Sequence, residues 1–331
     1  MRFPLVVCNG MCGTGKARTL LKEVPFFHAK MFSATTEALW EAFLEVSHFQ
    51  PEHIFLSEEF PLYSSSNSIL SCVDTPVDLV SSIQRFLKDP SLDKVVLAKK
   101  RTIIFKDPLE PLSIISTLIN TFPKDRVFAF MPDPLTLFFG TTPENLFVRK
   151  KDHISVDCIA GTVLEGDEES LFTSKLVKEH GFVREFVQRK LSPFLVSQKT
   201  SDLGVKSAGN VSHLYQTVSG ILHKDVTDQQ LLNALHKTPA TLGHPSFLAQ
   251  QFLNENEPFD RGMYAGVCGW MSEEMTTLKV CIRSGLVHKN TLSLFAGAGI
   301  TKESIAEDEV QEINNKFKTL EEVFLERTMS Q

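Results

Sequence analysis

The chain of 331 residues carries 34 Lys and Arg against 40 Asp and Glu, a formal net charge of -6. This balance argues against a general nucleic-acid binder, because neutralising phosphates requires clustered basic residues. The hydrophobic content of 42% is ordinary for a globular protein. No apolar run approaches the roughly 20 residues that cross a bilayer, so we expect neither a nucleic-acid nor a membrane partner.

The N-terminal segment and the cysteines bear on the compartment. The first residues, MRFPLVVCNGMCG, contain one basic residue and a very short apolar run, so they make a poor signal peptide. Six cysteines in a chain this long do not suggest a disulfide framework, and Cys8 and Cys12 are the only close pair. We therefore expect buried thiols in a cytoplasmic protein.

The predicted elements change in character near residue 94. The first ninety residues mix short apolar runs with a helical pattern at 38–46, and the alternating and apolar runs that follow favour strands separated by turns. We expect strands over 94–105, 126–131, 135–139, 146–149, 264–270, 278–282 and 291–295. We expect helices over 167–191, 231–235, 245–253 and 307–326. Strand clusters with helices grouped between them predict an α+β fold rather than a regular βαβ alternation.

One N-terminal motif suggests a nucleotide site. Residues 10–16 fit G-x-x-x-x-G-K and follow the apolar run 5–7, as in a phosphate-binding P-loop. The next residue is Ala17, however, so the hydroxyl that would bind Mg²⁺ is missing. We favour a glycine-rich turn, with nucleotide binding as the alternative.

Three charged side chains are candidates for chemistry. Glu179 has mostly apolar neighbours at helical spacing, and a carboxylate there needs either a metal ion or an ion pair, for example with Lys175. Glu144 follows a Thr-Pro turn between apolar runs, where burial would make it a general acid; the alternative is a surface turn. Lys94 opens a strand and would be a candidate base if it pointed into a cleft. Taken alone, it is better explained as a solvated strand end.

Two features near the C-terminus are weaker taken alone. Glu309 and Glu312 lie one turn apart at the start of the last helix, where acidic residues are also favoured by the helix dipole. A small anion needs a cation and a stretch of backbone that it can approach closely. Arg283, within a strand-like run, could supply the cation, and the glycines at 297 and 299 could leave the backbone open.

Short motifs along the chain, in one order, carry a family resemblance. They are KVVLA (94–98), TPENL (142–146), AGT (160–162), K-x-x-x-E-H (175–180), TPA (238–240), EPFDR (257–261), GW (269–270), IR (282–283) and GAGI (297–300). Together they resemble the chorismate-utilising enzymes, which include the isochorismate, salicylate, anthranilate and aminodeoxychorismate synthases. The resemblance covers about 94–324. It implies a layered fold like that of anthranilate synthase component I, with mixed, largely antiparallel sheets flanked by helices.

The resemblance also implies roles and domain limits. Lys94 would be the base and Glu144 the acid, while Glu179 and Glu312 would bind Mg²⁺ with Glu309 nearby. The expected substrate-binding residues are Gly161, Thr162, His213, Ala240, Arg283, Ala298 and Gly299. Residues 1–90 would form the variable N-terminal part and 91–331 the chorismate-binding catalytic region, within one structural domain.

Lys94 favours one branch of the family. Ammonia-using anthranilate synthases typically have glutamine at this position and threonine where this chain has Ala240. Both residues favour water as nucleophile, so we predict an isochorismate synthase, a hydroxymutase-type isomerase that needs no amidotransferase partner. The alternatives are a salicylate synthase, which also eliminates pyruvate, an anthranilate or aminodeoxychorismate synthase component, and a non-catalytic paralogue. The motifs do not choose between menaquinone and siderophore biosynthesis.

The chain also departs from the family pattern. Val163 and Leu164 stand where an arginine usually follows the Gly-Thr pair, and Val310 replaces the usual aromatic residue between the paired glutamates. Lys99 stands where arginine is common, and 241–242 also differ. None of these changes removes a predicted catalytic group.

Overall fold

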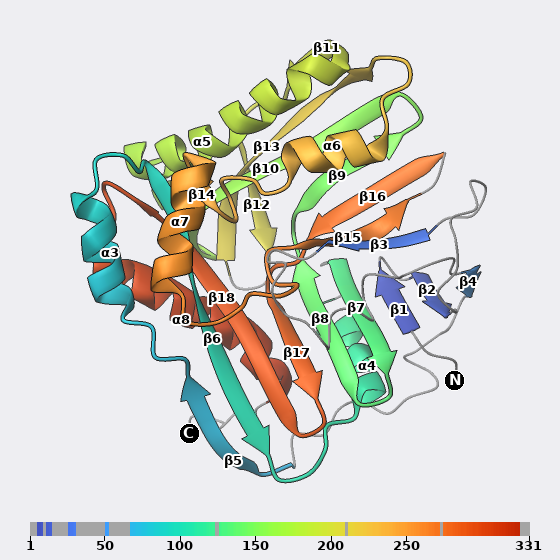
Figure 1. Cartoon of the computed structure of the whole chain (residues 1–331), viewed down its shortest axis with the longest axis vertical. Helices are drawn as coiled ribbons and strands as arrows, with labels where there is room; N and C mark the ends of the chain where they lie inside the picture. Colours follow the sequence, from blue (N-terminus) through green and yellow to red (C-terminus); the bar gives the residue numbers. More distant parts are fainter. Residues whose placement is uncertain are drawn as a thin grey trace.

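The computed structural model describes residues 5–8, 11–14, 26–30, 50–52, 67–122, 126–208, 211–271 and 274–324. Their strands form two sheets, and the strand pairings within both are antiparallel. Helices α4 (Pro111–Thr121) and α8 (Ala306–Phe324) pack on one sheet, and α5 (Ser174–Leu191) packs on the other (Figure 1). The predicted α+β class is confirmed.

The first sheet holds the strand that carries Lys94. Its order is β14 (Gly243–His244), β6 (Lys94–Phe105), β18 (Thr291–Thr301), β17 (Ser284–His288), β8 (Thr136–Thr142), β7 (Arg126–Asp133), β1 (Leu5–Cys8), β2 (Met11–Thr14) and β4 (Gln50–Glu52), with β5 (Ile69–Asp74) paired to β6. The run KVVLA is buried, and β6 pairs with β18 along eleven positions, from Ile104↔Thr291 to Lys94↔Thr301. This pairing places the GAGI motif beside KVVLA.

The second sheet carries the AGT motif and His213. Its order is β11 (Leu195–Thr200), β13 (Val211–Leu222), β10 (His153–Leu164), β9 (Asn145–Lys150), β16 (Met275–Val280), β15 (Val267–Met271) and β3 (Phe26–Lys30), with β12 (Gly204–Ala208) paired to β13. The β10–β13 register shifts between Ala160 and Thr162, where Gly161 has φ +73°. A non-glycine residue would be strained in this bulge.

Each sheet has its own hydrophobic core. Around the first sheet, buried residues of α3 (Leu79–Lys88), α4, α7 (Ser246–Asn256) and α8 pack together, and around the second those of α5 and α6 (Asp228–Leu235). Ile282, which lies between β16 and β17, contacts both cores. Figure 1 shows helices α5 and α6 lying over the second sheet.

Several predicted elements are confirmed with shifted ends. The strand 94–105 matches β6, and the last helix is α8. The helix predicted over 167–191 is wrong at its start, since 168–172 form a 3₁₀ turn and α5 begins at Ser174. The Thr173 hydroxyl accepts a hydrogen bond from the Leu176 amide there, which satisfies an end amide of the helix. The predicted elements do not include the helices α3 and α4 or the strands β5, β10, β11, β12, β13, β14 and β17.

The N-terminal predictions are tested only in part. The helical pattern at 38–46 lies outside the described residues, as do residues 10 and 15–17 of the P-loop-like motif. Its centre, Met11–Thr14, is strand β2 in a hairpin with β1, which does not match the loop of a P-loop. Strand β1 pairs with β7 and β3 with β15, which supports the proposal that 1–90 and 91–331 share one structural domain.

The described cysteines match the thiol prediction except at one position. Cys158, Cys268 and Cys281 are buried and form no disulfide bond, whereas Cys72 on β5 is exposed. No helix among the described residues is long and apolar enough to cross a membrane.

Candidate active site

A cavity lies where the two sheets and helices α5 and α8 meet. Its empty space, counted together with the solvent at its opening, is about 800 Å³. Ten of the twelve predicted site residues line it: Lys94, Glu144, Gly161, Thr162, Glu179, His213, Ala240, Arg283, Gly299 and Glu312. They come from segments separated by up to 218 residues, so the sheet pairings bring them together.

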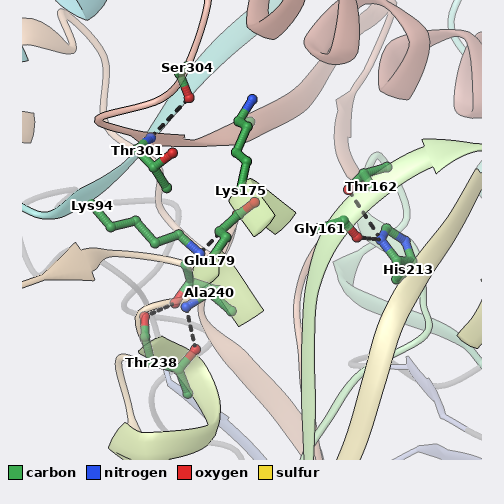
Figure 2. A network of polar contacts seen from close by, with 12 residues as sticks. Lys94, Gly161, Thr162, Lys175, Glu179, His213, Thr238, Ala240, Thr301 and Ser304 are labelled. Atoms are coloured by element: carbon green, nitrogen blue, oxygen red, sulfur yellow. Dashed lines mark hydrogen bonds and ion pairs between the residues drawn. The ribbon is translucent and has the colours of Figure 1, made fainter. Parts of the chain in front are cut away.

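Lys94 and Glu179 form a buried ion pair in this cavity. The Lys94 Nζ lies 3.0 Å from Glu179 Oε1, and the two side chains are 1% and 9% exposed (Figure 2). Lys94 is therefore not a solvated strand end. Glu179 is paired, but not with Lys175, as the sequence spacing suggested. The buried face of α5 packs on β10 and β13, and Glu179, in the first turns of this helix, reaches Lys94 on β6.

Gly299 makes room for this pair. It stands across from Val96 on the neighbouring strand, and a Cβ there would overlap Glu179 Oε1 and touch the Lys94 stem. Absence of a side chain at 299 is therefore a condition for the close approach of Lys94 and Glu179. Ala298, which was predicted to bind substrate, is buried in the core of the first sheet and does not line the cavity. Alternate residues of a strand face opposite sides, so Gly297 and Gly299 face the cavity.

Glu144 occupies the turn that leads from β8 in the first sheet to β9 in the second. The Glu144 amide donates to Thr142 Oγ1, and its carbonyl accepts from the Val280 amide. The side chain is 3% exposed. Burial raises the pKa of Glu144 to about 8, and the negative charge of Asp157 adds to the rise. A carboxyl group that is protonated at neutral pH can act as a general acid.

Arg283 and Lys316 form the cationic wall of the cavity, and His213 holds Arg283. Arg283 Nη2 lies 2.8 Å from His213 Nε2. Figure 2 shows His213 Nδ1 beside the Gly161 carbonyl oxygen and Thr162 Oγ1, each 3.2 Å away. Burial and the Arg283 charge hold the pKa of His213 well below its usual range. His213 is thus neutral, donates from Nδ1 to the Gly161 carbonyl and accepts from Arg283 at Nε2.

The backbone at Arg283 differs from the prediction. Arg283 does not lie within a strand but between β16 and β17, with φ +47°. This left-handed conformation is costly for a residue with a side chain, and such residues gather at functional sites. Ala265, which also lines the cavity, has φ +59°.

Two carboxylates on α8 each pair with a lysine. Glu312 Oε1 lies 2.7 Å from the Lys316 ammonium, and Glu309 Oε1 lies 2.7 Å from the Lys175 ammonium. Glu312 lines the cavity, whereas Glu309 lines an adjoining pocket that shares Thr162 and Glu312 with it. Burial raises the pKa of Glu309, and the Glu312 charge adds to this rise.

The donor set fits a magnesium ion held partly by substrate. Within the described part of the chain, no three His, Cys, Asp or Glu side chains gather into a complete metal cage. Mg²⁺ usually takes only one or two protein carboxylates and completes its shell with water and ligand oxygens. Glu179 and Glu312 offer two such groups in one cavity, and the like charges of Glu309 and Glu312 favour a cation there.

Two cavity residues escaped the sequence reading. Lys316 Nζ lies 2.7 Å from both the Gly297 carbonyl oxygen and Glu312 Oε1. Its place one helical turn after Glu312 was the available signal. Tyr264 stacks on Phe295, with ring centroids 5.4 Å apart, and both line the cavity. No spacing in the sequence marks Tyr264, because its turn meets β18 only in the fold.

The cavity combines residues of two sheets with paired cations and carboxylates, an arrangement suited to a small anion. The family model described as "Chorismate binding enzyme" matches residues 15–325, so the chain belongs to the chorismate-binding enzyme family. The resemblance drawn from the motifs is confirmed.

Relatives and solved structures agree with this assignment. The chloroplastic isochorismate synthase of Catharanthus roseus is 33% identical over 68% of the chain and 41% of its own length. The isochorismate synthase MenF of Haemophilus influenzae is 31% identical over 72% of the chain and 58% of its own length. The chain therefore spans about half the length of these curated relatives.

The fold itself is that of solved family members. The structure of MenF from Escherichia coli superposes with a TM-score of 0.81 at 21% identity, over 98% of this chain and 89% of that one. Anthranilate synthase component I from Streptococcus pneumoniae gives 0.67 at 22% identity, over 76% and 60%. The predicted likeness to the component I fold is confirmed.

Proposed function

We propose that this protein is an isochorismate synthase, which converts chorismate to isochorismate by adding water at C2 and losing the C4 hydroxyl. The observation that carries the proposal is that Lys94, on strand β6, and Glu144, in the turn between β8 and β9, line one cavity, where burial raises the pKa of Glu144 to about 8. Isochorismate synthases are also prominent among the relatives of this chain.

The two groups would divide the proton transfers. Lys94 would first release to solvent the proton that its ammonium carries in the ion pair with Glu179, and its neutral amine would then accept a proton from water as the oxygen bonds to C2. The ring double bonds shift, and the Glu144 carboxyl donates its proton to the C4 hydroxyl, which leaves as water. One water enters and one leaves, so the reaction is an isomerisation and needs no redox cofactor. Proton return from Lys94 to Glu144 through solvent restores the enzyme.

The cationic wall would hold the dicarboxylate substrate. Arg283, fixed by His213, and Lys316, fixed by the Gly297 carbonyl, present positive charge to the cavity. We propose Mg²⁺ as the cofactor, held by Glu179 and Glu312 with Glu309 close by. When bound, it supplies positive charge that offsets repulsion between these glutamates and a substrate carboxylate. Gly161, Thr162, Ala240 and Gly299 would shape the remaining wall.

The lysine at position 94 supports water rather than ammonia as the nucleophile. Ammonia-using relatives typically carry glutamine there, and Ala240 stands where they carry threonine. No amidotransferase partner is needed for water addition. The product would serve menaquinone or siderophore biosynthesis, since the names of the related proteins include a menaquinone-specific and a vibriobactin-specific isochorismate synthase.

Product identification tests the proposal. Purified protein, chorismate and Mg²⁺ are incubated with and without ammonia, and the products are separated by chromatography. Isochorismate alone supports the assignment. Anthranilate formed only with ammonia would overturn it, and salicylate with an equal amount of pyruvate would assign the chain to salicylate synthesis instead.

A further inference from the structure

Asp157 is a buried carboxylate behind the cavity that none of the roles above uses. It lies on β10, two residues before Ile159, which lines the cavity, and it is 5% exposed. Its Oδ2 accepts hydrogen bonds from both the amide and the side-chain nitrogen of Asn145, each at 3.0 Å. Its Oδ1 accepts from the Tyr215 hydroxyl at 3.2 Å.

These contacts tie Asp157 to the general acid. Asn145 directly follows Glu144, so the paired hydrogen bonds fix the end of the turn that carries it. They also decide which carboxyl is charged, because three donors and the Lys206 ammonium, 3.5 Å from Oδ2, stabilise an anion at Asp157. Two buried carboxyls close together cannot both ionise cheaply, so the proton belongs on Glu144.

We propose that Asp157 is a positioning residue that keeps Glu144 in its protonated, proton-donating form and fixes the turn from which Glu144 enters the cavity. This inference rests on the proposed role of Glu144 as general acid. Asp157 would favour the proton on the Glu144 carboxyl, and Lys206 would disfavour it.

The charged groups around Glu144 set the direction of each effect. Besides Asp157 and Lys206, they are Lys94 on β6 and the Cys158 thiol on β10. Burial raises the pKa of Glu144 most, Asp157 raises it further, and Lys206 and Lys94 lower it. Burial also raises the pKa of Cys158, so that thiol stays neutral. Removing the Asp157 charge therefore lowers the pKa of Glu144, and removing the Lys206 charge raises it.

The test compares pH–rate profiles of Asp157→Asn, Asp157→Glu and Lys206→Gln with wild type. In Asp157→Asn, which keeps an acceptor for Asn145, the alkaline limb of kcat should move about one pH unit lower. The activity ratio of wild type to variant should then grow by about sevenfold between pH 6 and pH 8.5. Asp157→Glu should restore the limb, and Lys206→Gln should move it higher. A pH-independent loss in Asp157→Asn would overturn the proposal.

A second readout does not depend on turnover. Carbon-13 labelled glutamate allows the Glu144 carboxyl to be assigned by its absence in Glu144→Gln and then titrated by NMR. A lower midpoint in Asp157→Asn and a higher one in Lys206→Gln support the inference, and unchanged midpoints in both refute it. If the protein makes no isochorismate but the midpoints move, the proposed function fails while the Asp157–Glu144 coupling stands. Should Asp157→Asn fail to fold, Lys206→Gln decides the matter by itself.

Discussion

Replacing Glu144 by glutamine should make the protein more stable and less active. A carboxyl whose pKa is raised from 4.5 to about 8 in the folded state keeps its proton there, whereas the unfolded chain releases it near 4.5. The folded state therefore binds more protons than the unfolded state between these values. Wild-type stability must fall as pH rises through this window and level off above pH 8. Glutamine, which is similar in shape and uncharged, removes this dependence.

The size of the effect follows from the pKa difference. Each pKa unit corresponds to about 1.4 kcal/mol, so the full penalty above pH 8 is about 5 kcal/mol. The same linkage gives about 3 kcal/mol at pH 7 and about 1 kcal/mol at pH 5. Glu144→Gln should thus gain stability over wild type progressively from pH 5 to pH 9.

Urea unfolding at pH 5, 7 and 9 measures the difference directly. Glu274→Gln is a matched control, because the Glu274 side chain is 80% exposed and its nearest cation, Lys151, is 3.8 Å away. We expect no pH-dependent difference for the control. In parallel, Glu144→Gln should lose chorismate turnover by about 10²-fold or more, since glutamine cannot donate the acid's proton.

A pH-independent stability difference between Glu144→Gln and wild type would contradict a raised pKa of Glu144 in the folded protein. Such a result would mean that Glu144 ionises as easily in the folded protein as in the unfolded chain. Full activity of the variant would separately exclude Glu144 as the acid. The stability and activity measurements therefore test the burial of the carboxyl and its chemical role independently.

Three further substitutions test the rest of the site. Lys94→Gln should reduce turnover by at least about 10²-fold while chorismate still binds in the presence of Mg²⁺, as measured by calorimetry; retained turnover contradicts the base assignment. Glu312→Gln should raise the Mg²⁺ concentration for half-maximal activity by at least about tenfold, more than Glu309→Gln does, and equal effects would place both side chains on the ion. Gly299→Ala should lower the stability by about 1–3 kcal/mol in thermal unfolding, because its Cβ would overlap Glu179. Gly204→Ala, where a Cβ meets only the Tyr215 carbonyl at 3.9 Å, is its control.

Local sequence patterns predicted the elements whose residues alternate or repeat regularly along the chain. The apolar run after Lys94 predicted β6 with its observed ends, and the helical spacing near the C-terminus predicted α8. The 12-residue strands β10 and β13 were missed, because β10 interrupts its apolar residues with Asp157 and a glycine bulge. The features that hid β10 from the sequence pattern, a buried carboxylate and a glycine bulge, lie beside the cavity.

The sequence by itself determined the family, the α+β class and most of the residues that line the cavity, because short motifs keep their residue types and order along the chain. Only the tertiary structure decided the partners. Spacing along α5 suggested Lys175 for Glu179, yet the fold brings β6 and α8 to this helix, so Glu179 pairs with Lys94 and Lys175 pairs with Glu309. The left-handed backbone of Arg283 and the Asp157 anion behind Glu144 likewise depend on contacts between distant segments, which no local pattern encodes.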